Sequence, residues 1–448
     1  MDTITTIRAN KNSDNNENFR YNNDMKESHN TYTLDNGLTI LLKEIHTAPV
    51  ISHWVWYRVG SRNEIPGKTG LSHWVEHMQF KGTQKFSSEL IDREIARHGG
   101  QMNAFTYLDW TAFYETMPAD AIDIAIEMEA DRMSNSLYDP YEVESERTVI
   151  ISEREGMEND PTYRLNEKVR HAAFPNHPYG TEIIGEKADL LTISRDELYN
   201  HYQTYYAPNN AVLVMTGDFE TSEMIRRLEK AYHNAKPHSI PECGVNPAGL
   251  ITEPQTIEEH GPADVTTMQM LWRAPEGNDP DIFPLTILDS VLSGPSSLNM
   301  FGRGSVSNRT SRFYQKLVKN GLAIAIGGGY VTTIDPYLYT LSAFVLPGQD
   351  PRRITETVHA EIDKIIHEGI TEAELEKARK QAKAMFAYSC ENITNQAYWL
   401  GYASMFAEPS WYTNYLDNLY AVTTDDVMKI ASKYFRPENC LTGIYSSN

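Results

Sequence analysis

Three side chains with the chemistry of a metal site lie within five residues of one another, at His73, Glu76 and His77. In a helix, the i, i+3 and i+4 spacing places all three on one face. Two imidazoles one turn apart can bind a single Zn²⁺, and the carboxylate between them then lies where a general base for water belongs. So short a pattern also arises by chance, so a helix with two half-buried histidines and a solvated glutamate is the alternative.

Composition narrows the class of protein. A chain of 448 residues is too long for one ordinary core, so we expect two or three domains. Its 40% hydrophobic and 23% charged residues are typical of a soluble globular protein. No apolar run approaches the ~20 residues of a membrane span. The net charge of −21 argues against nucleic acid as a partner, so we expect neither nucleic acid nor a membrane to be bound.

The three cysteines are scattered and have neither metal-ligand spacing nor the number of a disulfide framework. Residues 1–30 are polar and rich in Asn, and they lack the apolar core of a secretory signal. We predict a disordered arm there. The compartment stays open, with the cytoplasm favoured over the periplasm.

Local patterns predict the elements around the histidine helix. Asn36-Gly37 between two apolar runs predicts a hairpin. Amphipathic periodicity and end signals predict helices farther along the chain. The expected strands cover 31–34, 38–42, 50–59, 101–107 and 110–115, and the expected helices cover 87–98, 119–135 and 139–157.

One unit occurs twice. The stretches 194–212 and 423–441 each combine a Ser/Thr helix cap followed by an acid, a helix, an aromatic-x-Pro-x-Asn turn and a closing strand. We therefore predict an α+β fold of two homologous α/β sandwich domains, each a mostly antiparallel sheet covered by helices. The expected limits are 31–235 for the zinc-binding domain, 236–249 for a linker and 250–448 for a second domain without the metal motif.

Two histidines leave zinc one protein ligand short of a catalytic set, and the acidic helix at 139–157 is the natural source of the third. The chain also resembles the pitrilysin/insulysin/mitochondrial-processing-peptidase family of zinc metallopeptidases, the inverzincins. The motifs that carry the resemblance are His73-x-x-Glu76-His77-Met78-x-Phe80-Lys81-Gly82-Thr83, Gly99-Gly100-Gln101-Met102-Asn103-Ala104-Phe105-Thr106, Glu146-Arg147-Thr148-Val149-Ile150-Ile151-Ser152-Glu153 and, more weakly, Pro178-Tyr179-Gly180.

The resemblance implies a role for each site residue. His73, His77 and Glu153 are the expected Zn²⁺ ligands, and Glu76 is the expected base. Glu146, two turns before Glu153 on the same helical face, is the expected carboxylate that orients the site. Glu155 and Glu158 lie on other faces of the same helix and are competing candidates, for which a solvated role is favoured.

The resemblance also implies a substrate strand. Asn103, Ala104 and Phe105 match the family's edge strand, to which a peptide adds as an extra strand. Asn103 is the expected contact to the substrate backbone. The alternative for Asn103 is a residue that only ends the loop after Gly99-Gly100.

One family feature is missing. Family members that act alone carry, in the second half, an Arg and a Tyr in a stretch like Leu-Arg-x-x-x-Gly-Leu-x-Tyr, and these stabilise the oxyanion. Val318 stands where the Arg would be, and Ile324 near where the Tyr would be. The chain also has two units where long members have four. We therefore expect half of a clamshell and a heterodimer whose other subunit supplies Arg and Tyr, with a homodimer as the alternative.

The sequence thus predicts a zinc endopeptidase that hydrolyses peptides or unfolded segments in a closed chamber. One alternative is a non-catalytic core subunit of a complex. Another is a processing protease for one dedicated precursor peptide. The loop at 293–305 is a candidate lid or partner contact, and a plain flexible loop is the alternative.

Overall fold

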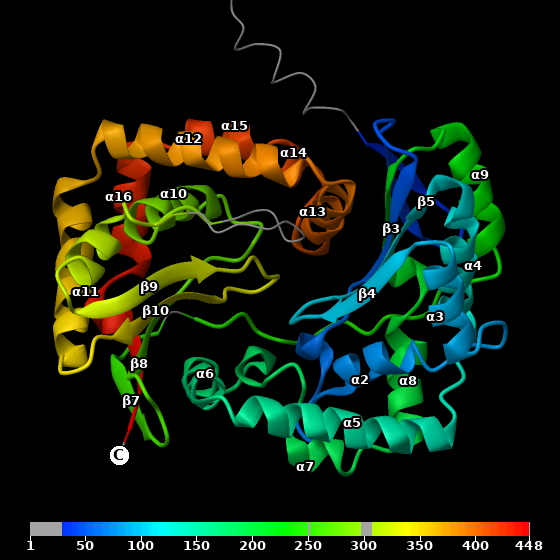
Figure 1. Ribbon diagram of the computed structural model, residues 1–448, viewed down its shortest axis with the longest axis horizontal. Helices are drawn as coiled ribbons and strands as arrows, with labels where there is room; N and C mark the ends of the chain where they lie inside the picture. The colour runs from blue at the N-terminus through cyan, green and yellow to red at the C-terminus, as the bar shows by residue number, and fades with distance from the viewer. Residues whose placement is uncertain (1–28, 250, 297–306, 448) are drawn as a thin grey trace, which may run out of the picture.

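The computed structural model describes residues 29–249, 251–296 and 307–447. These residues form two β-sheets, each covered by helices (Figure 1). The predicted arm at 1–30 and most of the loop at 293–305 lie outside the described residues. The predicted class, two α/β units with mostly antiparallel sheets, is confirmed.

The first sheet has six strands in the order β1-β2-β6-β3-β5-β4. All neighbours are antiparallel except β2 and β6, which are parallel. β1 and β2 form the predicted hairpin, and Gly37 in its turn has a φ of 87°. The strands are β1 (Asn30–Thr33), β2 (Thr39–Glu44), β3 (Val50–Tyr57), β4 (Gln101–Thr106), β5 (Thr111–Pro118) and β6 (Ala211–Gly217).

The described part of the first half also contains eight α-helices, one of which carries the acidic stretch. The predicted helix at 87–98 begins after the Ser87 cap, and the one at 139–157 begins after the Asp139 cap. The helices are α2 (Leu71–Met78), α3 (Ser88–Arg97), α4 (Ile122–Asn135), α5 (Pro140–Glu158), α6 (Pro161–Ala173), α7 (Lys187–Leu190), α8 (Arg195–Tyr205) and α9 (Thr221–Tyr232).

The second sheet repeats the topology of the first without a counterpart of β1. Its order β7-β11-β8-β10-β9 matches β2-β6-β3-β5-β4, and β7 and β11 are parallel as β2 and β6 are. Residues 236–249 join the halves without helix or strand. The elements are β7 (Gln255–His260), β8 (Thr267–Arg273), β9 (Ala323–Tyr330), β10 (Leu338–Val345), β11 (Leu441–Ser446), α10 (Ile282–Leu292), α11 (Pro351–Glu368), α12 (Glu372–Ser389), α13 (Ile393–Phe406), α14 (Ser410–Thr413), α15 (Tyr415–Ala421) and α16 (Thr424–Tyr434).

Both predicted capping boxes are present in the repeated tail. Ser194 and Glu197 close the start of α8, and Thr423 and Asp426 close the start of α16. Among the described helices, none is both long enough and apolar enough to cross a membrane.

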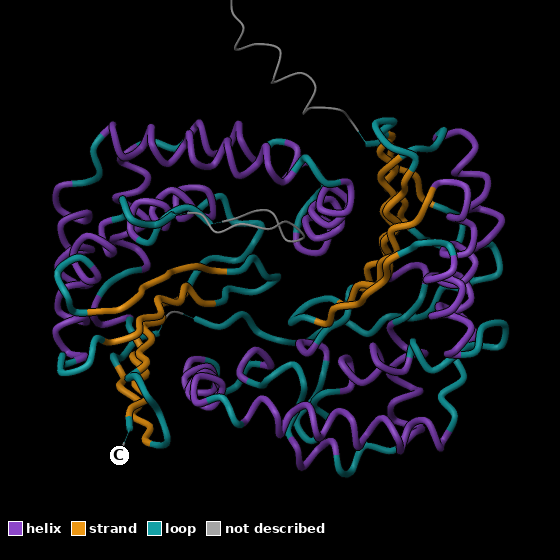
Figure 2. The backbone as a smooth tube through the Cα atoms, in the orientation of Figure 1, coloured by secondary structure: helices purple, strands orange, loops and turns teal. Residues whose placement is uncertain are grey.

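In each half, one helix packs against the sheet of the other half. The sequence did not predict this exchange. α13 packs against β3 and β6 of the first sheet, and α6 packs against β11 of the second. In Figures 1 and 2, α13 lies between β3 and the rest of its own half, and it also contacts α14. Trp54 and Trp56 of β3 therefore share one hydrophobic core with α13 and the second sheet. Separating the two halves would therefore expose α6 and α13 to solvent.

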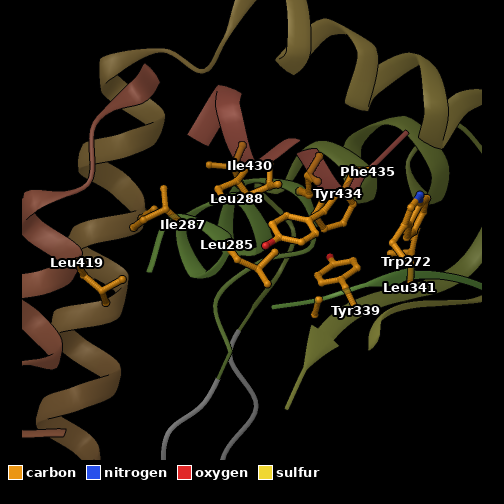
Figure 3. Close-up of a cluster of buried hydrophobic side chains, with 14 of the residues drawn as sticks. Trp272, Leu285, Ile287, Leu288, Tyr339, Leu341, Leu419, Ile430, Tyr434 and Phe435 are labelled. Carbon is orange, nitrogen blue, oxygen red and sulfur yellow. The ribbon is translucent and has the colours of Figure 1, made fainter. Parts of the chain in front are cut away.

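The core of the second half lies between its sheet and the helices α10 and α16. Figure 3 shows Leu285 and Leu288 of α10 near Ile430 and Tyr434 of α16, with Trp272 of β8 to one side. This packing fixes which faces of α10 are left for other contacts.

Two helical glycines provide a test of the packing between the halves. A Cβ on Gly401 of α13 would lie 2.0 Å from Nε1 of the buried Trp56, whereas a Cβ on Gly156 of α5 would meet nothing within 4 Å. We expect Gly401→Ala to lower the free energy of unfolding by about 1–3 kcal/mol through overpacking. Gly156→Ala should raise it by up to about 1 kcal/mol, because Ala is the better helix former. Chemical denaturation of both variants measures the difference, and equal shifts would contradict close packing at Gly401.

Candidate metal centre

α2 presents the histidine motif on one face and the core on the other. Trp74, Val75 and Met78 are buried in the hydrophobic core of the first half. His73 and His77 are half-buried on the opposite side, and their rings lie with centroids 4.6 Å apart. The structure therefore places the predicted residues on one helical face.

The start of α2 is held by a buried carboxylate that the sequence reasoning missed. Glu64 is 7% exposed, and its two oxygens accept the backbone N–H groups of Gly70 and Ser72, each at 2.7 Å. The cap position itself is Gly70, which has no side chain to accept these donors. An acid in the loop before a helix with a glycine cap is the signal that could have identified Glu64.

α5 is fastened beside α2 by two arginines. The Arg147 guanidinium lies 4.7 Å from the ring centroid of Trp74 in α2, and its Nη2 donates to the Ile193 carbonyl at 2.8 Å. Arg154 is buried and donates to the Gly185 carbonyl at 2.7 Å and to Glu167 at 2.6 Å. These contacts turn the remaining face of α5, with Glu146 and Glu153, toward the histidines.

Three predicted ligands meet between the two helices. Glu153 Oε2 lies 4.0 Å from His73 Nε2 and 3.7 Å from His77 Nε2. Among the described residues, this is the one group of three or more His, Cys, Asp or Glu whose ligand atoms lie close enough for a shared ion. Tetrahedral ligands at ~2.0–2.2 Å from Zn²⁺ are separated by about 3.3–3.6 Å. The three side chains fit that ion after small side-chain movements.

Glu146 acts on the site through His77. Its Oε1 accepts a hydrogen bond from His77 Nδ1 at 2.7 Å, which leaves His77 Nε2 free as a ligand atom. Its Oε2 lies 2.5 Å from Lys81 Nζ. Burial alone would raise the pKa of Glu146, but the His77 hydrogen bond and the Lys81 charge lower it below its usual value. A carboxylate held in its charged form orients the imidazole.

Glu76 lies on the same face but makes different contacts. Its Oε2 accepts a hydrogen bond from Thr106 Oγ1, at the end of β4, at 2.5 Å. Burial raises the pKa of Glu76 despite this hydrogen bond. Thr106 belongs to the motif that ends β4. Its contact with Glu76 could not be predicted from that motif, because the two residues are 30 positions apart in the chain.

The pKa values of the two imidazoles shift in opposite directions. Burial, with the repulsion of His77, lowers the pKa of His73 to about 3, so His73 is neutral. For His77, burial lowers the pKa, but the surrounding carboxylates, with Glu146 first, outweigh burial and raise it above its usual value. A metal at this site therefore competes with a proton at His77.

The competing acids of α5 make their contacts elsewhere. Glu155 is exposed and pairs with Lys187. Glu158 Oε1 lies 3.0 Å from Arg154 Nε. Neither belongs to the cluster of His73, His77 and Glu153.

The predicted substrate residues lie on β4, at the edge of the first sheet. Asn103 is exposed, and its Oδ1 accepts the backbone N–H of Ala104 at 2.9 Å. Ala104 is buried, and the ring of Phe105 stacks on Tyr114 with centroids 6.0 Å apart. Their contact with a substrate remains a prediction.

In the second half, the two positions that match the family's oxyanion donors carry no hydrogen-bond donor in their side chains. Val318 ends a short π-helical turn, Tyr314–Val318, and packs against the core. Ile324 lies on β9 with 47% of its side chain exposed. Arg312 is occupied by Glu374, which accepts two of its hydrogen bonds at 2.8 and 2.9 Å.

Two family models match the chain. The model described as "Insulinase (Peptidase family M16)" matches residues 39–187, and the model described as "Peptidase M16 inactive domain" matches residues 192–382. The first contains all of His73, His77 and Glu153.

Curated relatives match along most of their length. "Mitochondrial-processing peptidase subunit beta" of Lentinula edodes is 27% identical over 418 residues, covering 90% of this chain and 86% of the relative. "Uncharacterized zinc protease YmxG" of Bacillus subtilis (strain 168) is 27% identical over 368 residues, covering 82% and 85%. The chain is therefore similar to proteins named as zinc proteases or as a processing-peptidase subunit.

Solved structures share the fold. A protease from Helicobacter pylori superposes with a TM-score of 0.87 at 24% identity, covering 94% of this chain and 100% of that one. A peptidase M16 inactive domain from Pseudomonas fluorescens superposes with a TM-score of 0.83 at 14% identity, covering 94% and 98%.

Metal content distinguishes the acids of α5. We expect Glu153→Gln to lose zinc on dialysis, because the amide is a weak ligand where the carboxylate would bind. Glu155→Gln makes the same chemical change two residues away, at an exposed side chain outside the cluster, and should keep zinc at the wild-type ratio. Elemental analysis of the dialysed proteins measures both. Equal zinc in the two variants would contradict the assignment of Glu153.

Proposed function

Because the chain belongs to the insulinase family of peptidases, peptidase family M16, we propose that it is a zinc-dependent endopeptidase. Its substrates are peptides or unfolded polypeptide segments. The observation that carries the proposal is the meeting of His73, His77 and Glu153 between two helices, with Glu76 on the same face.

The ligand atoms of His73, His77 and Glu153 suit a catalytic zinc ion. Two imidazole nitrogens and one carboxylate oxygen are a common catalytic set for Zn²⁺, and they leave a position open. When bound, Zn²⁺ supplies a Lewis acid that polarises a carbonyl and acidifies water. Glu146 holds His77 in the tautomer that presents Nε2 to the ion.

Glu76 handles the proton. Its carboxylate takes a proton from the attacking water and later returns that proton to the leaving amine. Burial raises the pKa of Glu76, which makes the carboxylate a stronger base than an exposed one. The hydroxyl of Thr106 holds the other side of this carboxylate in place through Oε2.

β4 supplies the surface for an extended substrate. It is the edge strand beside β5, and its last residue, Thr106, already contacts Glu76. A peptide that pairs with Asn103, Ala104 and Phe105 would be extended alongside Glu76. Main-chain pairing depends little on the side chains of the substrate. It therefore suits unfolded substrates and excludes folded ones.

A second subunit completes the site. Val318 and Ile324 cannot donate hydrogen bonds to an oxyanion, and Arg312 is occupied by Glu374. We therefore favour a heterodimer in which the other subunit supplies Arg and Tyr donors and closes the chamber. The similarity to a relative named as a subunit of a mitochondrial processing peptidase supports this arrangement. A homodimer is the less favoured alternative.

Replacing the base separates catalysis from metal binding. We expect Glu76→Gln to keep zinc but to cleave an unfolded fluorogenic peptide about 10²–10⁴-fold more slowly, because the amide cannot accept the proton. The assay uses the protein with any co-purifying partner. Glu155→Gln controls for the loss of one charge and should keep the wild-type rate. Wild-type cleavage by Glu76→Gln would exclude this mechanism.

Activity of the isolated chain tests the need for a partner. We expect the purified chain, with one zinc per chain, to cleave at about 1% or less of the rate of the complex, because losing an oxyanion donor costs about 10²–10³ in rate. Metal analysis of the same sample excludes zinc loss as the cause, and native mass spectrometry identifies the oligomer. If the monomer cleaved at the full rate of the complex, the need for a second subunit would be refuted.

A further inference from the structure

The second half has a position equivalent to the metal centre. α10 packs against α12, α16 and β9, as α2 packs against α5, α8 and β4. The two strands β4 and β9 both lie at the edge of their sheets. The face of α10 turned toward α12 and β9 is therefore the counterpart of the histidine face of α2.

The ligand positions on the acidic helix have small or apolar residues in the second half. Glu146 and Glu153 are the seventh and fourteenth residues after the Asp139 cap of α5. The seventh and fourteenth residues after the Thr371 cap of α12 are Ala378 and Met385. No imidazole replaces them among the described residues that line this position.

A cavity of about 220 Å³ occupies the equivalent position. It is lined by Ala378, Ala382 and Met385 of α12 and by Thr286, Ile287, Asp289 and Ser290 of α10. Figure 3 shows why α10 can line it, since Leu285 and Leu288 point to the α16 side and Ile287 points away from them. An apolar cavity of ~150 Å³ is large enough for benzene, so this one can hold a single ring with a short chain.

Aromatic rings form most of the rest of the wall, with Pro295, Ser296, Val331 and Thr332 completing it. Trp411 has an indole N–H without a hydrogen-bond partner among the described residues. Rings of Trp and Tyr attract cations to their faces. The aromatic part of the wall is made by Tyr330, Tyr398, Trp399, Tyr402, Trp411 and Tyr415.

Asp289 is the one charged residue among the described residues that line the cavity. It is 2% exposed, and its oxygens accept hydrogen bonds from Tyr339 at 2.8 Å and Ser296 at 2.9 Å. Within the described part of the chain, no Lys, Arg or His lies within ion-pair distance of it. Burial raises its pKa to about 6, and no cation among the described residues faces it.

We propose that this cavity, lined by the rings and Asp289, binds an organic ammonium group carried on an apolar stem. The carboxylate supplies the opposite charge, and the aromatic faces hold the stem and the cation. The ammonium can come from a free arylalkylamine or from a lysine side chain of a bound peptide. The proposal does not depend on peptidase activity, because it uses no residue of the metal centre.

Calorimetric titration of the zinc-loaded chain, with any co-purifying partner, tests the class of ligand. The probes are 2-phenylethylammonium, its neutral analogue 2-phenylethanol, and the peptide acetyl-Gly-Lys-Gly-amide. We expect the ammonium to bind at least tenfold more tightly than the alcohol. If the lysine peptide binds and the free amine does not, the natural source is a peptide; the reverse result indicates a free amine. Equal affinity for ammonium and alcohol, or binding of neither cation, would overturn the proposal.

Two substitutions locate the site. Asp289→Asn should remove the tenfold preference for the cation. Ala382→Phe should fill the cavity and weaken 2-phenylethylammonium at least tenfold, whereas Ala373→Phe, at an exposed position on the same helix, should not. Circular dichroism and zinc content confirm that each variant is folded. Because Ala382→Phe leaves Asp289 intact, it decides the question if Asp289→Asn fails to fold. Wild-type affinity in Ala382→Phe would place binding elsewhere and overturn the proposal.

Discussion

The apposition of α2 and α5 is the constraint on which the metal centre depends. The proposed ligands come from two helices, so the site exists only where those helices are held at one separation. The protein holds them with buried polar contacts that carry no chemistry of their own. Glu64 secures the start of α2, and Arg147 and Arg154 secure α5. Buried polar groups are costly unless they are hydrogen-bonded, so the contacts of Glu64 and Arg154 also favour a single arrangement of the two helices.

Local signals were enough to predict many elements of the first half and the two repeated tails, because these signals act within a few residues. The Asn36-Gly37 turn and the two capping boxes lie where the sequence placed them, and the helices predicted from 87 and from 139 begin at those positions. The spacing of Glu146 and Glu153 on one face of α5 was likewise readable, because helical periodicity sets it. That they turn toward the histidines came from the resemblance and not from spacing.

Contacts between distant segments were not predictable in this way. Thr106 reaches Glu76 from the end of β4, and Glu64 reaches the cap of α2 across a loop. The exchange of α6 and α13 between the sheets could not be predicted from sequence. α6 buries one apolar face and α13 is buried on nearly all sides, and neither pattern identifies the sheet that the helix covers. Position in the chain does not reveal which sheet a helix covers, because contacts between distant segments decide it.

The repeated unit shows how one scaffold separates structure from chemistry. α5 and α12 each begin at an N-cap, and they pack on the equivalent helices α2 and α10. The seventh and fourteenth positions after the cap are nevertheless carboxylates in α5 and Ala378 and Met385 in α12. With Ala378 and Met385 at these positions, aromatic side chains fill most of the space. A small cavity remains between α10, which packs on β9 and α16, and α12, which packs on α15. The scaffold thus sets the separation of the two helices in both halves, and the side chains at two helical positions decide what can occupy it.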